Sequence, residues 1–134
     1  MKRSPLLQPL SREHHTALSL ANACQRAAES GDTTLIDQAC QRGLQLYANE
    51  LDAHFNTEEQ TLLPLLQTTE TQPLAQRTLL EHRQLRDLLD GLRQSNAESL
   101  KEFGQLLKEH VRFEERELFP ALEVTLHARN QAEP

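Results

Sequence analysis

The sequence predicts an all-α protein, an up-down-up-down antiparallel four-helix bundle in which residues 1–134 form a single domain. The apolar residues are mostly Leu and Ala, which are strong helix formers, whereas the chain has only two valines and one isoleucine. Apolar residues recur every three or four positions along four long stretches. Short connections between long helices make them antiparallel neighbours. The core is expected at about residues 10–128, with short flexible termini.

The first two predicted helices are separated by one clear break. The first spans residues 11–30, because Ser11 is a good N-cap and Gly31 is a good C-terminal stop. The three residues that follow the glycine, Asp-Thr-Thr, all offer caps for the second helix. The polar stretch at residues 68–72 is expected to end it.

The last two predicted helices also have recognisable start signals. Pro73 suits the first turn of a helix over residues 73–94, where a missing N–H is harmless. Ser95 followed by Glu98 fits a capping box for a helix over residues 95–128. The six residues after that helix are expected to be a disordered tail.

Charge and hydropathy exclude several classes of partner. The formal net charge is −6, which argues against nucleic acid and against anionic membrane surfaces. No apolar run approaches the roughly 20 residues that span a bilayer, and the N-terminus lacks the apolar segment of a secretory signal. A cytoplasmic protein is therefore expected. Cys24 and Cys40 are too few for a disulfide framework and are interpreted as small, partly buried thiols.

The second and fourth predicted helices share a repeated pattern, H-x-x-x-E-E-x-x-L-(L/F)-P-x-L. It begins at His54 in one helix and at His110 in the other. Its prolines, Pro64 and Pro120, are expected to kink or end their helices. The first and third helices each contain a Glu-His pair. Each half of the chain therefore supplies one His and then a His–Glu pair, so a site between the halves would have approximate two-fold symmetry.

Titratable residues interrupt the apolar stripes of all four predicted helices: His14, His54, Glu58, His82, His110 and Glu114. Residues four apart share a helix face, so each His–Glu pair of the repeat points the same way. Buried carboxylates are costly unless they are paired or bind a metal, and no Lys or Arg lies on these stripes. We therefore expect these six residues to bind two metal ions. Imidazole and carboxylate donors suit iron, manganese or zinc.

Three neighbouring residues need to be separated from the expected ligands. His15 adjoins His14, but His14 aligns better with the apolar stripe and matches His82 in the repeat. His14 is therefore the favoured ligand. Glu59 and Glu115 lie one position off the inner face and are interpreted as solvated surface, with hydrogen bonding to the ligands as the alternative.

These residues resemble the H…HxxxE…H…HxxxE signature of the hemerythrin-like family, whose members carry an HHE cation-binding domain. The resemblance covers about residues 10–127. It implies a four-helix bundle with a non-heme di-iron centre, in which the four histidines are terminal ligands. Glu58 and Glu114 would be the bridging carboxylates.

Two positions depart from the oxygen-carrying members of that family. Those proteins have a second His one turn after the third-helix His, where this chain has Arg86. Their fourth helix uses a more widely spaced Asp, where this chain has Glu114. The missing fifth His argues against reversible oxygen carriage and leaves a coordination position for another ligand.

The resemblance implies a di-iron protein that binds O2 or a related small ligand such as NO, for oxygen or iron binding or sensing. Obvious catalytic machinery is absent from the sequence, which favours a binding protein over an enzyme. The alternative is a di-iron redox enzyme, or an iron–sulfur cluster repair or iron-delivery protein, acting on O2, peroxide or NO. A ferritin-like oxidase is disfavoured because the Glu-x-x-His marker is missing. A helical interaction module with a vestigial site remains as a third hypothesis.

Overall fold

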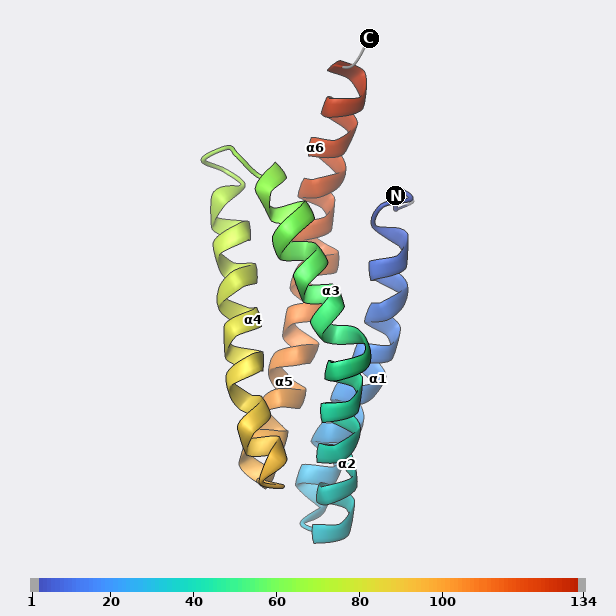
Figure 1. The fold of residues 1–134 in the computed structure, drawn as a ribbon, viewed down its shortest axis with the longest axis vertical. Coiled ribbons are helices and arrows are strands. Elements are labelled where there is room, and N and C mark those ends of the chain that lie inside the picture. The colour runs from blue at the N-terminus through green and yellow to red at the C-terminus, as the bar shows by residue number, and fades with distance from the viewer. Residues whose placement is uncertain (1–2, 133–134) are drawn as a thin grey trace.

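The computed structural model describes residues 3–132, and all regular structure in that range is helical (Figure 1). The chain forms four long helical rods, each made of one helix or of consecutive helical segments, which we number in chain order. The first rod is α1 (Gln8–Ser30) and the third is α4 (Gln72–Arg93). The second rod runs through α2 (Thr33–Leu46), η1 (Tyr47–Leu51), α3 (Asp52–Thr57), η2 (Glu58–Leu62) and η3 (Leu63–Leu65). The fourth runs through α5 (Ala97–Phe113), η4 (Glu114–Leu118) and α6 (Phe119–Ala132). The all-helical class is confirmed, and the rods are consistent with a four-helix bundle.

Each rod packs against at least two others. In the lower half of Figure 1, α1 packs against α2 and α5, and α4 packs against α5 and α2. Both ends of the described chain lie at the top of that view, whereas the α1–α2 and α4–α5 turns lie at the bottom. None of the described helices is long and apolar enough to cross a membrane.

The first helix begins earlier than the sequence predicts. α1 starts at Gln8, so Ser11 lies inside the helix and is not its cap. Pro9 occupies the first turn, where its missing N–H costs no hydrogen bond, and the neighbouring Leu7 is fully buried. The C-terminal stop is confirmed, because Gly31 has φ 68° and adopts the left-handed conformation that glycine tolerates best.

The other helix starts follow local capping rules. The Asp32 carboxylate caps α2 by accepting two backbone N–H bonds, and Pro73 lies in the first turn of α4 as predicted. The Ser95 cap is wrong. Ser95 has φ 54°, in the left-handed region, whereas Asn96 is extended and its side chain accepts from the Ser99 N–H. The predicted disordered tail is also wrong as far as Ala132, and the last two residues lie outside the described range.

π-Helical turns interrupt the second and fourth rods at matching positions of the repeat. η2 begins at Glu58 and η4 begins at Glu114, and each closes with a hydrogen bond from the residue directly before a proline. The prolines are Pro64 and Pro120, which have no N–H to continue the ladder. The second rod then ends at Leu65, whereas the fourth continues into α6. An extra residue in a turn rotates the residues that follow, and such turns recur at functional sites.

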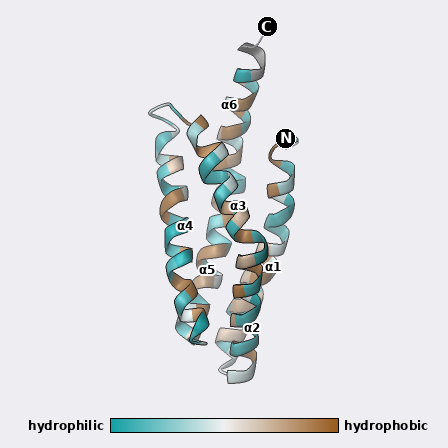
Figure 2. Cartoon of the chain, in the orientation of Figure 1, coloured by the Kyte–Doolittle hydropathy of each residue, from teal (hydrophilic) through white to brown (hydrophobic). Residues whose placement is uncertain are grey.

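The buried apolar residues form two clusters. The larger one lies toward the α1–α2 and α4–α5 turns and includes Cys24 and Cys40, which are buried free thiols. The smaller one lies toward the chain ends and includes Leu10 and Leu122. Hydrophobic and hydrophilic residues alternate along every rod (Figure 2). Where the two clusters meet, each rod places a buried histidine in the core.

Candidate metal centre

The six expected ligands come together in one buried layer between the two apolar clusters. None of them is more than 4% exposed, and both glutamates are fully buried. They form two overlapping groups of four, and within each group the potential ligand atoms lie within 4.8 Å of one another. One group contains His14, His54, Glu58 and Glu114, and the other contains Glu58, His82, His110 and Glu114. Each half of the chain thus supplies both histidines of one group, and the glutamates belong to both.

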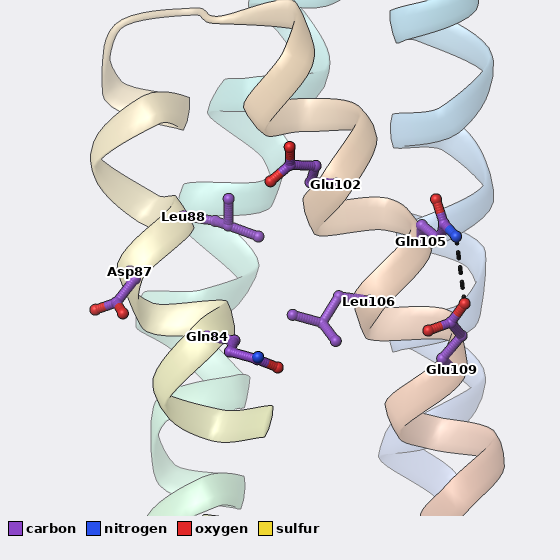
Figure 3. Close-up of a pocket in the computed structure, with 7 residues that line it drawn as sticks. All are labelled: Gln84, Asp87, Leu88, Glu102, Gln105, Leu106 and Glu109. Atoms are coloured by element: carbon purple, nitrogen blue, oxygen red, sulfur yellow. Dashed lines mark hydrogen bonds between the residues drawn. The ribbon is translucent and has the colours of Figure 1, made fainter. Parts of the chain in front are cut away.

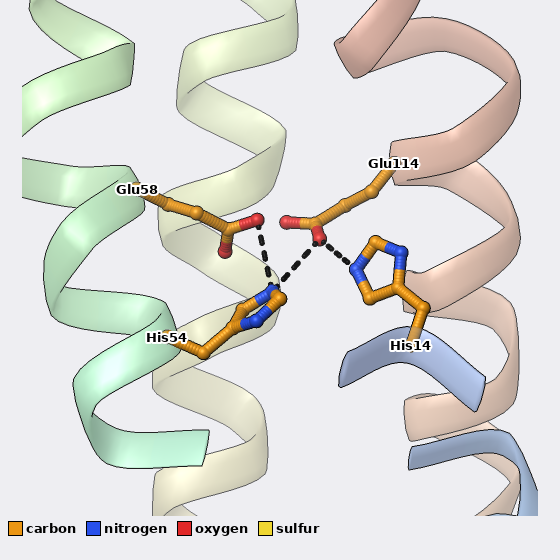
Figure 4. A group of neighbouring side chains, drawn as sticks. All are labelled: His14, His54, Glu58 and Glu114. Carbon is orange, nitrogen blue, oxygen red and sulfur yellow. Dashed lines mark hydrogen bonds and ion pairs between the residues drawn. The ribbon is translucent and has the colours of Figure 1, made fainter. Parts of the chain in front are cut away.

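The first group is shown in Figure 4. His14 Nε2 lies 2.7 Å from Glu114 Oε1, and His54 Nε2 lies 3.6 Å from the same oxygen. His54 Nε2 also lies 3.2 Å from Glu58 Oε2. The neighbouring His15 is exposed and has no part in the cluster. The structure therefore places His14, and not His15, on the inner face of α1.

The second group has a similar arrangement around the same two carboxylates. His82 Nε2 lies 3.0 Å from Glu58 Oε1, and His110 Nε2 lies 3.0 Å from Glu114 Oε2. The two carboxylates therefore stand between histidines of both halves of the chain. This is the two-fold arrangement that the sequence repeat predicts.

Several of these short contacts are not hydrogen bonds. Both carboxylate oxygens of Glu58, Oε2 of Glu114, and Nε2 of His82 and His110 are buried and have no hydrogen-bond partner. These atoms approach one another closely but are poorly aligned for hydrogen bonding. Unpaired buried polar atoms are costly unless a cation satisfies them. The donor set therefore fits a pair of metal ions held by imidazole and carboxylate groups.

The electrostatics of the cluster are dominated by the shared carboxylates. Burial alone lowers the pKa of His54, but the adjacent carboxylates of Glu114 and Glu58 outweigh it and raise that pKa to about 11. Burial opposes the protonation of His110 in the same way, and the charge of Glu114 raises the pKa of His110 to about 10. Burial alone would raise the pKa of Glu114. The imidazoles of His110, His14 and His54 outweigh that effect and hold this pKa well below its usual value.

Glu59 and Glu115 contact histidines of the cluster, so their interpretation as solvated surface is wrong, and the alternative of hydrogen bonding to these histidines is the one that the structure supports. Glu115 Oε2 lies 2.6 Å from His14 Nδ1, and Glu59 Oε2 lies 2.6 Å from His82 Nδ1. Both residues lie in π-helical turns, directly after Glu58 and Glu114. The regular helix period used for the sequence interpretation does not describe such turns, in which adjacent residues can both reach inward.

The sequence interpretation also missed two carboxylates. Glu13 Oε1 lies 2.9 Å from His54 Nδ1, and Glu81 Oε1 lies 2.6 Å from His110 Nδ1. The signal was present in the sequence, because both residues belong to the repeated Glu-His pairs. Each glutamate contacts a histidine of the next rod, and the spacing of residues in the sequence does not indicate that contact.

Two aromatic rings stack on the imidazoles. The Phe55 ring stacks on His82 with the ring centroids 4.0 Å apart and 17° between the planes. The Phe119 ring stacks on His14 at 5.2 Å and 16°. Both phenylalanines are buried, so they cover the histidines with apolar surface and restrict their rotation.

Arg86 occupies the position where oxygen-carrying relatives have a further histidine. Its guanidinium donates to Glu59 Oε2 at 2.9 Å and to the Tyr47 hydroxyl at 3.1 Å. It therefore binds the carboxylate behind His82 and supplies no ligand atom to the cluster.

A separate groove lies on the outer surface between α4 and α5 (Figure 3). It has a volume of about 430 Å³, and its lining includes Leu88 and Leu106 with acidic residues around them. None of its lining residues belongs to the His/Glu cluster. The groove therefore does not form part of the candidate centre.

Comparison with known proteins agrees with the geometry of the cluster. The profile described as Hemerythrin HHE cation binding domain matches residues 6–122, which is most of the chain and includes all six buried donors. Searches of curated proteins and of solved structures gave no significant match. The family's description names cation binding, and the structure brings together buried His and Glu donors that could hold metal ions. The chain belongs to the hemerythrin HHE cation-binding domain family.

Proposed function

We propose that this chain is a non-heme di-iron protein with an up-down-up-down topology in a single domain. The observation that carries the proposal is the pair of overlapping four-donor groups that share Glu58 and Glu114. One ion would be held by the two histidines of the first half, and the other by His82 and His110. The shared carboxylates would bridge the ions. Zinc or manganese would fit the same donors, and iron is preferred because of the family resemblance.

The small ligand proposed for this site is O2 or NO. Four protein donors for each ion leave coordination positions that a diatomic molecule can occupy. When bound, an iron pair supplies exchangeable positions and electrons for such a ligand. The chain itself contributes a site from which bulk water is excluded, since Phe55 and Phe119 cover the imidazoles with apolar surface. The apolar surface of these two phenylalanine rings suits a small uncharged molecule better than a polar substrate.

Metal stoichiometry tests the dinuclear site. We expect wild-type protein loaded anaerobically with Fe(II) to retain two ions per chain after gel filtration. Replacing both histidines of one half, in His14→Ala/His54→Ala or in His82→Ala/His110→Ala, should leave one ion. The matched control is His15→Ala, which is exposed and should retain two. Circular dichroism would verify that each variant is helical. Wild-type protein that retains no iron would contradict the proposal.

Gas addition separates ligand binding from redox catalysis at the same centre. A binding protein should form a stable adduct with one NO or O2 per iron pair, visible as a persistent change in the absorption spectrum. The redox-enzyme alternative instead predicts consumption of many O2, peroxide or NO molecules per chain when a reductant is supplied. Sustained turnover would therefore replace the binding function with the enzymatic one.

A further inference from the structure

Every histidine of the cluster touches a second carboxylate through its outer ring nitrogen. These outer carboxylates are Glu13, Glu59, Glu81 and Glu115. In each case Nε2 faces the centre and Nδ1 lies 2.6–2.9 Å from a carboxylate oxygen of another rod. The four contacts are therefore equivalent in chemistry and differ only in the rods that they join.

The four contacts form a closed ring around the bundle. Rod 1 reaches rod 2 through Glu13, rod 2 reaches rod 3 through Glu59, and rod 3 reaches rod 4 through Glu81. Glu115 closes the ring from rod 4 back to rod 1. Each rod thus supplies one histidine and one outer carboxylate. The ring follows the packing of neighbouring rods, since α1 packs on α2 and α5, and α4 packs on α5 and α2.

A carboxylate at Nδ1 decides which nitrogen of an imidazole is available to a metal. If Nδ1–H donates to the carboxylate, the Nε2 lone pair faces the centre and the ring cannot rotate freely. The negative charge also makes Nε2 a better electron donor. Four such contacts would aim Nε2 of all four histidines at the centre before any ion enters, and would keep a proton on Nδ1 when Nε2 loses its own proton to bind the ion.

Three of the outer carboxylates are held in place by arginines. Arg3 pairs with Glu115 at 3.1 Å, Arg86 with Glu59 at 2.9 Å, and Arg77 with Glu81 at 2.9 Å. Each guanidinium also lies over a phenylalanine ring, at 4.1–5.6 Å from the centroid. Glu13 differs, because His54 is its only partner among the residues that the structure describes. Glu13 therefore isolates the effect of the carboxylate from that of an arginine.

We propose that Glu13, Glu59, Glu81 and Glu115 are positioning residues that fix the Nδ1–H tautomer and orientation of the four histidines and thereby set the metal affinity of the centre. The proposal rests on the di-iron function proposed above, because it assigns a role toward those ions. It goes beyond that function in making affinity depend on four residues that are not ligands. It also makes the site dependent on the packing of all four rods, since every histidine is oriented by a carboxylate from a rod other than its own.

Substitution of Glu13 gives the sharpest test. Zn²⁺ affinity, measured by chelator competition, should fall in the order wild type, Glu13→Gln, Glu13→Ala, because Gln keeps an acceptor but loses the charge. The loss for Ala should be roughly 10–100-fold. Glu81→Ala should show a loss of the same order. Glu29→Gln is the matched control, since Glu29 lies on α1 like Glu13 but is exposed and has no part in the cluster.

A second readout distinguishes positioning from a general loss of stability. In the Zn²⁺-loaded protein, long-range ¹H–¹⁵N NMR should show a slowly exchanging Nδ1–H on His54, and Glu13→Ala should make that proton exchange faster while leaving His110 unchanged. Wild-type Zn²⁺ affinity in both Ala variants, within twofold of Glu29→Gln, would overturn the positioning role and leave the metal centre intact. If wild-type protein binds neither Zn²⁺ nor Fe(II), the proposed function fails and the positioning role fails with it.

Discussion

The imidazoles of the cluster and a bound metal pair would compete for the same carboxylates. In the metal-free protein each ring lies between an inner and an outer carboxylate, which favours the doubly protonated form. Four imidazolium protons carry the same charge as two divalent ions. Exchange of one for the other would therefore leave the net charge of the buried layer unchanged, which avoids the cost of adding charge to a low-dielectric interior.

Metal uptake should release protons at neutral pH. His54 and His110, with pKa values of about 11 and 10, are protonated at pH 7 and must lose a proton before Nε2 can bind an ion. We expect isothermal titration calorimetry at pH 7, repeated in buffers of different ionisation enthalpy, to show at least two protons released per chain on full loading. An apparent binding enthalpy that does not depend on the buffer would contradict this expectation.

The residues that sequence reasoning located are those whose positions follow from one helix alone. His54 and Glu58 are four apart, so the helical period places them on one face regardless of the neighbouring rods. The outer carboxylates depend on contacts between rods and on π-helical turns. Glu81, for example, contacts His110, which is 29 positions away in the sequence. No local spacing encodes that pairing, although the repetition of the Glu-His pair could have suggested it.

At the level of elements, the close packing of α5 against α1 depends on a glycine. A Cβ added at Gly104 of α5 would lie 2.8 Å from the backbone oxygen of Ala21 in α1. Backbone atoms in a packed helix cannot move aside easily, so the two rods would have to separate. Gly43 of α2 provides a contrast, because a Cβ there would meet only side-chain atoms, Leu92 Cδ1 at 3.3 Å and Phe103 Cε1 at 3.8 Å.

These two glycines should respond to alanine in opposite directions. Gly104→Ala should lower the free energy of unfolding of the metal-free protein by about 1–3 kcal/mol through overpacking. Gly43→Ala should raise it by up to about 1 kcal/mol, because alanine is the better helix former and the leucine side chain can shift. Urea unfolding followed by circular dichroism measures both. Equal effects of the same sign would show that the α1–α5 contact adapts more readily than its geometry indicates.

Element boundaries were predicted best where one residue type decides them. Gly31 ends α1 and Asp32 caps α2 because left-handed and capping geometries have strong residue preferences. The start of α5 was wrong because Ser95 and Asn96 are both capping residues, and the turn geometry selects the second. The π-helical turns could not be predicted from a regular period. The prolines that follow two of them predict only a kink or a helix end.

For the whole molecule, the repeat explains why one polar layer can occupy the middle of an apolar core. Each half contributes the same donors at the same height, so charges and donors balance across the bundle. Apolar clusters lie on both sides of this layer and exclude water from it. The stability of the entire bundle must therefore depend on what satisfies the buried His and Glu groups, whether protons or metal ions.

The metal-free and metal-loaded proteins should accordingly show opposite dependences of stability on pH. In the metal-free protein, the pKa values of His54 and His110 are raised from 6.5 to about 11 and 10. Their stabilisation is therefore complete below pH 6.5 and is lost as the pH rises toward 10, with a slope of up to about 1.4 kcal/mol per pH unit for each imidazole. The lowered pKa of Glu114 contributes stability that is lost only as the pH falls below 4.5.

In the metal-loaded protein the folded state holds no proton on Nε2, whereas the unfolded histidines still bind protons below pH 6.5. Stability should then rise with pH through that value and level off above it. Urea unfolding between pH 6 and 9, with and without Zn²⁺, would measure both curves. The two stability curves should diverge steadily above pH 6.5. Only in the metal-free protein does a rising pH remove the imidazolium charges that balance Glu58 and Glu114. Parallel curves would mean that the ions bind outside this layer, since only ligation at these imidazoles reverses the sign.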